Sequence, residues 1–249
     1  MELDLLTWNV DGLDERHVDL RSEAACLEIL LQPTHPHVVC MQEVVARTFY
    51  AHFVPHFQHA GFRPFPARPP ANANYFDVVF VREPLVVEEA LREPFPASRL
   101  GRELTTVRLA WGGRTFVVMT GHLESLREGS DERKRQLAEV ARRLRTPETL
   151  ALFAGDTNLR EAETEGLLDG IGDAWTMMGS PAELRHTWDP SATPNIRGGK
   201  GGRGLRFDRV LLSTGWTTTA LAVVGRSPVE GADGLWPSDH VGLRVSLRA

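Results

Sequence analysis

Residues 149–160, TLALFAGDTNLR, contain a short apolar run that stops at a glycine and is followed at once by polar residues. The run Leu150–Ala154 is bounded by turn-forming residues, which predicts a strand buried on both faces. Ligands of open α/β sheets bind at the carboxyl ends of strands, so we expect Asp156 and Asn158 at a functional site. The alternative is that Asp156 caps a helix that begins near Asn158.

Five further strand-like runs also have an acid, an amide or an imidazole at or near one end. A single polar end could be a helix cap, but six in one chain favour a shared site. The runs are Leu3–Trp8, Val38–Met41, Phe116–Thr120, Leu205–Leu212 and Val241–Leu247, and their polar residues are Asn9, Gln42, Glu43, His122, Glu124, Asp208, Ser238, Asp239 and His240.

The length and composition indicate one large domain. The chain has 249 residues, 42% of them hydrophobic, and nothing in it marks a second domain, so we expect one domain over residues 1–249. No apolar stretch reaches about 18 residues and no signal peptide is evident, which predicts a soluble, cytoplasmic protein that does not enter membranes. Cys26 and Cys40 lie in apolar patterns, and we expect both to be reduced core residues.

The net charge of -5 neither indicates nor excludes nucleic-acid binding, because a local patch decides such binding. Two segments are locally basic. The first is a predicted helix, where we expect a solvated face, and it contains Arg133, Lys134, Arg135, Arg142, Arg143 and Arg145. The second is glycine-rich, has Asp208 as its only acid, and contains Arg197, Lys200, Arg203, Arg206 and Arg209.

Hydrophobic periodicity predicts four helices. Leu20, Ala24, Leu27 and Leu31 follow helical spacing in the first of them. The helices are predicted over Val18–Leu31, over Arg47–His59 with an irregularity at Pro55, behind an N-cap at Ser130, and near Glu161–Leu168.

The remaining predicted elements are strands, and one long irregular segment, Gly179–Gly204, separates the last of them from the rest. Gly112 and Gly113 stand between two predicted strands and are typical of a two-residue hairpin turn, so we expect antiparallel strand pairs. The strands lie near Tyr75–Arg82, Leu85–Glu89, Glu103–Trp111, Arg114–Thr120, Leu205–Ser213, Trp216–Val224 and Val241–Leu247. This pattern predicts an α/β sandwich of two packed sheets with helices outside.

The polar residues at the strand ends are oxygen donors without cysteine, a set that suits Mg²⁺ or Mn²⁺. Mg²⁺ is typically held by one or two carboxylates, so we predict Glu43 as the direct ligand. His122 and His240 would then donate to a phosphoryl oxygen, although each could instead be a satisfied, partly buried side chain. The oxygen donors are Asn9, Glu43, Asp156, Asn158, Asp208 and Asp239.

Two other kinds of site are conceivable. His52, His56 and His59 have the spacing of three imidazoles on one helix face, as in a zinc site, but Pro55 disturbs that helix and no acid accompanies them in the sequence. A glycosidase would use two of the carboxylates as acid and base. That interpretation gives no role to the two histidines at the strand ends, His122 and His240.

Six motifs together resemble the endonuclease/exonuclease/phosphatase superfamily, and they cover almost the whole chain. They are TWN at 7–9, QE at 42–43, GHLES at 121–125, GDTN at 155–158, RFDR at 206–209 and SDH at 238–240. Within the superfamily, longer strings resemble its tyrosyl-DNA phosphodiesterases, which remove topoisomerase tyrosine from DNA 5′ ends. These strings are TWNVDGLDER, HLES, FAGDTNLRE, TWDP, LRFDR and PSDHVGL.

The resemblance implies a four-layer α/β sandwich of two packed mixed sheets and a single catalytic phosphodiesterase domain, residues 1–249. Glu43, helped by Asn9, would hold Mg²⁺, with Mn²⁺ as the alternative ion, and Asp239 would support the metal through water. Asp156 and Asn158 would orient the attacking water. His240 would bind the scissile phosphate, and Asp208 would hold its imidazole in one tautomer.

The resemblance also implies the substrate, DNA with 5′-phosphotyrosyl ends that is single-stranded or overhanging. His122, Ser125 and Arg102 would lie near the phosphate, Trp188 and Phe207 would line the strand-binding groove, and Arg206 would contact the substrate. Val241 departs from the vertebrate pattern, in which a tryptophan follows SDH. We expect a monomer without a protein partner and without the ubiquitin-binding segment of longer relatives.

Alternative functions remain at this stage. A different superfamily activity is possible: an abasic-site endonuclease, a general nuclease, or an inositol-phosphate or lipid phosphodiesterase. A binding module without catalysis would lack one of Glu43, Asp156 or His240, and all three are present.

Overall fold

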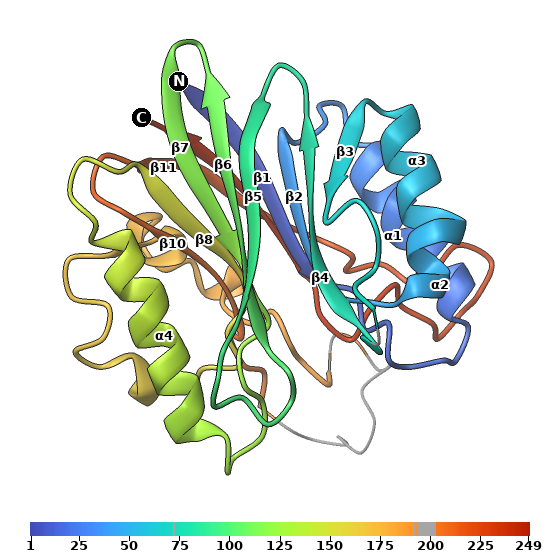
Figure 1. Ribbon diagram of the computed structural model, residues 1–249. Coiled ribbons are helices and arrows are strands. Elements are labelled where there is room, and N and C mark those ends of the chain that lie inside the picture. Colours follow the sequence, from blue (N-terminus) through green and yellow to red (C-terminus); the bar gives the residue numbers. More distant parts are fainter. Residues whose placement is uncertain (72, 192, 194–202) are drawn as a thin grey trace.

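Two six-stranded sheets lie face to face in the computed structural model, which describes residues 1–71, 73–191, 193 and 203–249 (Figure 1). The first sheet has the order β11 (Thr217–Val224), β12 (Gly242–Arg248), β1 (Glu2–Asn9), β2 (Val38–Val44), β4 (Phe76–Arg82), β3 (Phe62–Phe65). The second has the order β5 (Val86–Pro94), β6 (Glu103–Trp111), β7 (Arg114–Thr120), β8 (Ala151–Asp156), β10 (Asp208–Leu212), β9 (Gly172–Asp173).

Each sheet has one parallel pair, joined by a helix on its outer face. β1 and β2 are parallel and connect through α1 (Val18–Leu30), whereas β7 and β8 are parallel and connect through α4 (Ser130–Leu144). The flanking strands β12, β4, β6 and β10 pair antiparallel to them. The carboxyl ends of the parallel strands and the amino ends of β10 and β12 therefore share one edge, where the polar residues of these strand ends lie.

Three apolar clusters hold four layers together. The central cluster packs the inner faces of both sheets and includes Leu5, Cys40, Val118 and Leu152. A second cluster packs α1 and the 46–59 helix on the first sheet, and a third packs α4 on the second. The predicted four-layer α/β sandwich of two mixed sheets is thus confirmed, and both cysteines are free and buried, as expected.

The buried face of α1 differs from the prediction. Leu20, Leu27 and Leu31 are exposed, Leu31 to 77%, whereas Ala25 and Ile29 are fully buried. Both faces of this helix carry apolar residues at helical spacing, so periodicity alone could not identify the face that contacts the sheet.

The helix predicted over Arg47–His59 forms with an interruption. It consists of α2 (Ala46–Thr48), a π-helical turn (Phe49–Phe53) and α3 (Val54–His59). Pro55 lacks an N–H and crowds the preceding turn, and a π turn is one way to accommodate it. Phe49, Phe53 and Phe57 are fully buried against the first sheet, so the helix stays attached through the irregular turn.

Several short elements differ from the predictions. β3, β9 and α5 (Ala174–Met177) were not predicted, because each is too short to show a period. The helix predicted near Glu161–Leu168 is a 3-10 turn, Glu161–Thr164. The N-cap is Gly129, not Ser130, whose hydroxyl donates to Glu163 instead. Among the described residues, no helix has the length and hydropathy needed to cross a membrane.

Candidate active site

Asp156 is the centre of the group that the strand ends bring together. It ends β8 and is buried, and its Oδ2 accepts a hydrogen bond of 2.9 Å from Asn9 Nδ2 at the end of β1. This bond joins the two sheets. Only glycine fits at position 155, where the apolar run ends, because a Cβ on Gly155 would lie 2.3 Å from the carbonyl oxygen of Gly121. The GDTN and GHLES segments can therefore touch only through glycine.

Three residues of the site adopt left-handed backbone conformations that are costly for side chains other than glycine. The φ angles are 49° at Asp11, 57° at Glu43 and 51° at Asn158. Such strain gathers at functional sites, where the surrounding structure enforces it. At Asn158 the enforcing bonds are visible, since its N–H donates to Asp156 Oδ1 at 2.9 Å and its Nδ2 donates to Leu123 O at 3.2 Å.

His240 and Asp208 form a buried pair beside Asp156. His240 Nδ1 lies 2.7 Å from Asp208 Oδ2, and its Nε2 lies 3.7 Å from Asp156 Oδ2. Burial opposes a charge on the imidazole, but Asp208, Asp239 and Asp156 outweigh it and raise the pKa of His240 well above its ordinary value. The pair therefore presents an imidazolium whose Nε2 faces the site. The predicted contact between Asp208 and His240 is present.

The position of His240 is fixed through the backbone. Ser238 Oγ donates to Asn9 O at 2.6 Å and accepts from the His240 N–H at 3.1 Å. Trp8 Nε1 donates to the His240 carbonyl at 3.0 Å. The SDH motif is thus bonded to β1 through the Ser238 hydroxyl and through the His240 carbonyl.

His122 is a buried imidazole of the opposite kind. Its Nε2 lies 3.3 Å from Asp156 Oδ2 and its Nδ1 lies 3.4 Å from Glu43 Oε1. Burial, followed by the charge of Arg102, lowers the pKa of His122 to about 3, so it is neutral at pH 7. Within the described residues Nδ1 has no hydrogen-bond partner, which leaves a buried polar atom facing the site.

The carboxylates around this edge carry more negative charge than the described cations offset. Burial and then Asp239 raise the pKa of Asp11 to about 8. Burial and then the charges of Asp239 and Asp156 raise the pKa of Glu43 to about 7. A divalent cation would relieve this repulsion, and oxygen donors without sulfur suit a hard ion such as Mg²⁺. The residues therefore fit a metal of that class.

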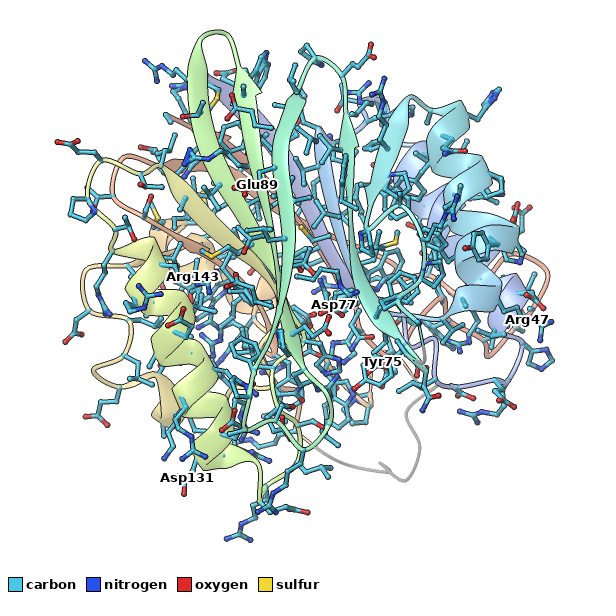
Figure 2. All side chains as sticks on the ribbon, viewed as in Figure 1. Arg47, Tyr75, Asp77, Glu89, Asp131 and Arg143 are labelled. Atoms are coloured by element: carbon cyan, nitrogen blue, oxygen red, sulfur yellow. The ribbon has the colours of Figure 1, made fainter. Side chains whose placement is uncertain are left out.

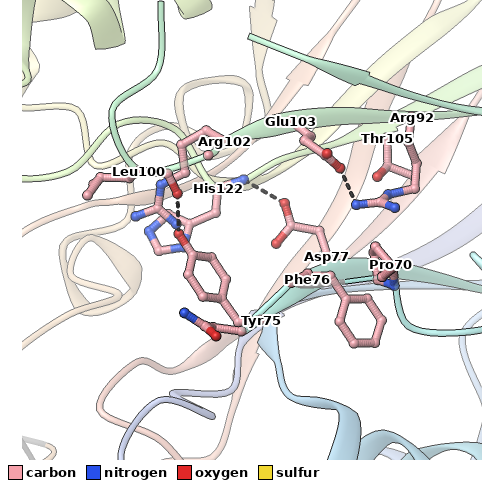
Figure 3. A pocket seen from close by; sticks show the side chains of 14 residues that line it. Pro70, Tyr75, Phe76, Asp77, Arg92, Leu100, Arg102, Glu103, Thr105 and His122 are labelled. Carbon is pink, nitrogen blue, oxygen red and sulfur yellow. Dashed lines mark hydrogen bonds and ion pairs between the residues drawn. The ribbon is translucent and has the colours of Figure 1, made fainter. Parts of the chain in front are cut away.

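Arg102 has unused hydrogen-bonding capacity beside a cavity of about 340 Å³. Its Nη2 donates to Ser125 Oγ at 3.4 Å and its guanidinium lies 5.3 Å from the ring centre of Tyr75, yet Nε and Nη1 are buried without a hydrogen-bond partner among the described residues. Figure 3 shows Arg102, Tyr75 and His122 around this cavity, with the His122 amide bonded to Asp77 at 2.9 Å. Unpaired guanidinium nitrogens suit a phosphate oxygen.

Two aromatic rings continue the site beyond the histidine pair. The ring centres of Trp188 and Phe207 are 5.7 Å apart, and Phe207 lies 6.4 Å from the His240 ring. Trp188 Nε1 also donates to Asp239 Oδ2 at 3.2 Å. A base that stacked on these rings would place the adjoining phosphate near the imidazolium.

Two described arginines of the basic stretch, Arg206 and Arg209, are buried beside acids. Arg206 is buried and donates from Nη1 to Asp173 Oδ2 at 2.6 Å and from Nε to Glu161 Oε1 at 3.0 Å. Arg209 is also buried beside the same two acids. These acids are distant in the sequence, so the local count of charges missed them. Arg197 and Lys200 lie outside the described residues.

The predicted solvated face of α4 also needs a correction, because Arg133 is fully buried. Its Nη2 donates to Glu163 Oε1 at 2.6 Å and its Nη1 donates to Glu124 O at 2.7 Å. This arginine attaches the helix to the loop after β7.

Three residues near the site were missed by sequence analysis. Asp11 lies in the TWNVDGLDER string, two residues after Asn9, so the acid that follows the first strand was an available sequence signal. Asp77 lies partly buried inside β4, and desolvation of its carboxyl raises its pKa to about 7. Figure 2 shows Tyr75 and Asp77 together near the centre of the molecule. An acid within an apolar strand was the sequence signal that could have identified Asp77. No sequence signal could have identified Tyr75.

The strand-end geometry agrees with comparisons to known proteins. Tyrosyl-DNA phosphodiesterase 2 of Rattus norvegicus is 33% identical over 256 residues, which cover 98% of this chain and 66% of that protein, and the Homo sapiens protein is 30% identical over 98% of this chain and 67% of its own. The chain thus spans about two thirds of the length of these relatives. A structure of D. rerio TDP2 complexed with a single-strand DNA product has a TM-score of 0.89 at 28% identity, covering 100% of this chain and 99% of that chain. The profile of the Endonuclease/Exonuclease/phosphatase family matches residues 6–240, and the chain belongs to this family.

Proposed function

We propose that the chain is a Mg²⁺-dependent phosphodiesterase that hydrolyses 5′-phosphotyrosyl ends of single-stranded or overhanging DNA to a 5′-phosphate and tyrosine. The observation that carries the proposal is the buried His240–Asp208 pair, whose imidazole faces Asp156. The relatives named above, which are tyrosyl-DNA phosphodiesterases, support the choice of substrate.

The proposed metal site combines carboxylates that repel one another with one side-chain amide oxygen. Glu43 would be the main ligand, Asn9 would contribute its side-chain oxygen, and Asp239 would act through water. When bound, the cation would supply positive charge to the phosphate. Mg²⁺ is the proposed ion, and Mn²⁺ has the same preference for oxygen donors.

The phosphate would be held by nitrogen donors from both sheets. His240 Nε2 would donate to a phosphoryl oxygen whose negative charge grows as the bond to tyrosine breaks. Asp208 keeps the other ring nitrogen protonated, so the imidazolium remains oriented towards that oxygen. Arg102, with Nε and Nη1 unpaired among the described residues, would bind a second oxygen, and Ser125 holds the guanidinium in place.

Asp156 and Asn158 would orient the attacking water. Burial raises the pKa of Asp156, but His122, His240 and the amide of Asn9 outweigh it and keep the pKa below its ordinary value. The carboxylate is therefore ionised and accepts a hydrogen bond from water rather than acting as a strong base. Water would add to phosphorus and release its proton to solvent, and the bond to the phenolic oxygen would break. The phenolate would leave with little acid assistance, because the pKa of tyrosine is only about 10, and would then take up a proton from solvent.

The deciding experiment compares a 5′-tyrosyl oligonucleotide with an abasic-site duplex of the same length. We expect kcat/KM in Mg²⁺ to favour the tyrosyl substrate by at least about 10²-fold, with little activity in EDTA. Glu43→Gln should remove most turnover and weaken the response to Mg²⁺, because it loses the main ligand charge. A ratio below one would identify an abasic endonuclease instead, and full activity in EDTA would refute the metal-dependent mechanism.

A further inference from the structure

A second group of metal-ligating side chains lies on the outer helical layer of the first sheet. The sequence shows no acid beside His52, His56 and His59, and the structure corrects this, because α1 brings Glu23 to two of them. Glu23 Oε2 lies 3.0 Å from His52 Nδ1 and 2.9 Å from His56 Nε2. One carboxylate oxygen therefore faces two imidazole nitrogens from a different helix.

The π-helical turn determines which nitrogens meet the acid. His52 lies within this turn and His56 lies in α3, one turn later. An extra residue per turn changes the direction of the side chains on either side of it, and such turns often occur at functional sites. His52 consequently presents Nδ1, and His56 presents Nε2, to the same oxygen. The buried phenylalanines of the segment hold this geometry against the sheet.

We propose that Glu23, His52 and His56 form a Zn²⁺ site with an open fourth position. Two imidazoles and one carboxylate are a donor set that zinc accepts, and three protein ligands leave room for water or another ligand. The three ligand atoms lie within 4.8 Å of one another. Tetrahedral bonds of about 2.0–2.1 Å require ligand atoms about 3.3 Å apart, so small side-chain movements suffice.

Asp19 gives the site the outer carboxylate that zinc-binding histidines usually have. His52 Nε2 lies 3.3 Å from Asp19 Oδ1, so this ring can donate to Asp19 while Nδ1 is free to bind metal. Asp19 and Glu23 are four residues apart and share one face of α1. Arg47, seen at the outer end of the helical layer in Figure 2, pairs with Asp19 and holds it.

The chemistry of this cluster differs from that of the active site. The active site gathers carboxylates for a hard cation, and its histidines are engaged with Asp208 and Asp156. The outer cluster contains two imidazoles that share one acid. The side chains of Glu23 and His56 are 38% and 34% exposed, so an ion can reach them from solvent. The proposed site does not depend on the proposed phosphodiesterase activity.

The test is a calorimetric titration of the metal-free full chain with ZnCl₂ in excess Mg²⁺. Glu43→Gln serves as the background, because it weakens metal binding at the active site. We expect one zinc equivalent in this background, and its loss, or binding weakened at least about 10-fold, after His56→Gln or Glu23→Gln. Asp19→Asn should weaken binding about 10–100-fold, as expected for an outer-sphere partner.

His59→Gln is the matched control, because His59 belongs to the same helix and has no carboxylate partner among the described residues. It should bind zinc like the background. Coincident titrations of the background, His56→Gln and Glu23→Gln would overturn the proposal, as would loss of the equivalent in His59→Gln. If a variant fails to fold, anomalous scattering from zinc-soaked wild-type crystals decides: a peak between Glu23 and His56 supports the site, and no peak there refutes it.

Discussion

At the scale of single residues, the charge on His240 depends on a neighbour that does not itself face the substrate. Asp208 is fully buried and lies opposite Asp156 in the β8–β10 register, and its Oδ2 bonds to the imidazole of His240, through which we expect it to act on the phosphate. A residue that acts through another should lose its effect once that other residue is removed. This reasoning makes the pair testable without knowledge of the substrate pose.

Asp208→Asn should lower turnover about 10²-fold or more, because the neutral amide no longer supports the imidazolium. His240→Ala should cost a similar factor, and the double variant should be hardly worse than His240→Ala alone. The measurement is kcat/KM for all four proteins, with the exposed Asp233→Asn as the control. Losses that multiply would show that the two residues act independently and would exclude the proposed pair.

Asp11 provides a test in the metal-free protein. Its pKa is about 8 in the fold against 3.8 for an unperturbed aspartate. Between these values the folded protein retains a proton that the unfolded chain has released, so the free energy of unfolding falls as pH rises towards 8. Asp11→Asn removes this dependence and should stabilise the protein at pH 8 by on the order of 1 kcal/mol more than at pH 4.

The measurement is urea unfolding of both proteins in EDTA at the two pH values. Asn can still accept the 3.2 Å hydrogen bond from Arg21 Nη1, so the comparison isolates the charge. A stability difference that does not change with pH would show that the Asp11 carboxyl has no raised pKa.

The predictability of the site also differs from residue to residue. Asp156, Asn9 and His240 could be found because each follows or precedes a recognisable apolar strand, and strand ends converge at one edge. The burial of Arg206 could not be predicted, because its acids, Glu161 and Asp173, are far away in the sequence. Local charge patterns cannot reveal partners that only the tertiary fold supplies.

At the scale of elements, most of the longer strands were predictable because they show apolar runs or alternation, whereas the helices showed where periodicity is insufficient. Ile29 and Leu27 are both apolar and both fit a helical repeat, yet only Ile29 is buried. The position of α1 is also set by Arg21, which is buried and bonds to the loop after β1. A charged residue on the buried face is invisible to a search for apolar stripes.

The loop after β1 determines where Glu43 stands. Gly12 N–H donates to the Glu43 carbonyl at 3.2 Å, and a Cβ on Gly12 would lie 2.2 Å from that oxygen. Gly12→Ala should therefore push the loop away from β2, displace Glu43, and lower kcat/KM by about 10-fold or more. The overpacking should also destabilise the fold by about 1–3 kcal/mol.

Gly166→Ala is the control for stability alone. Gly166 has a φ of +71°, and a Cβ added there would meet no described atom within 4 Å beyond its chain neighbours, so alanine strains the backbone without contacting the site. It should lower the melting temperature and leave kcat/KM unchanged. Equal losses of activity in both variants would mean that general destabilisation, not displacement of Glu43, explains the effect of Gly12→Ala.

At the scale of the whole molecule, the proposed function predicts a preference for a single-stranded DNA end over a long duplex. The net charge is -5, and the described arginines of the 203–209 stretch include two that are buried beside acids. A protein that follows a duplex backbone needs a broad basic surface. The two sheets instead converge on one small site, with Trp188 and Phe207 beside the histidine pair.

If binding relies on stacking, the aromatic rings should matter only for substrates with a base to stack beyond the phosphotyrosine. Trp188→Ala and Phe207→Ala should each lower kcat/KM for a 5′-tyrosyl oligonucleotide by roughly 5–100-fold, as expected from about 1–3 kcal/mol per stacked base. The loss should be smaller for the p-nitrophenyl ester of thymidine 5′-phosphate, which is too short to extend along the groove. The informative quantity is the ratio of the two kcat/KM values.

Trp188→Phe separates stacking from the second contact of this tryptophan. It keeps an aromatic ring but loses the Nε1–H bond to Asp239, which is proposed to support the metal. Any effect of that lost bond should fall equally on both substrates and leave the ratio unchanged, whereas Trp188→Ala should lower the ratio. A ratio that stays unchanged in Trp188→Ala, with activity on both substrates lowered as in Trp188→Phe, would show that the tryptophan acts through Asp239, and the single-stranded end would then have to be bound elsewhere on the molecule.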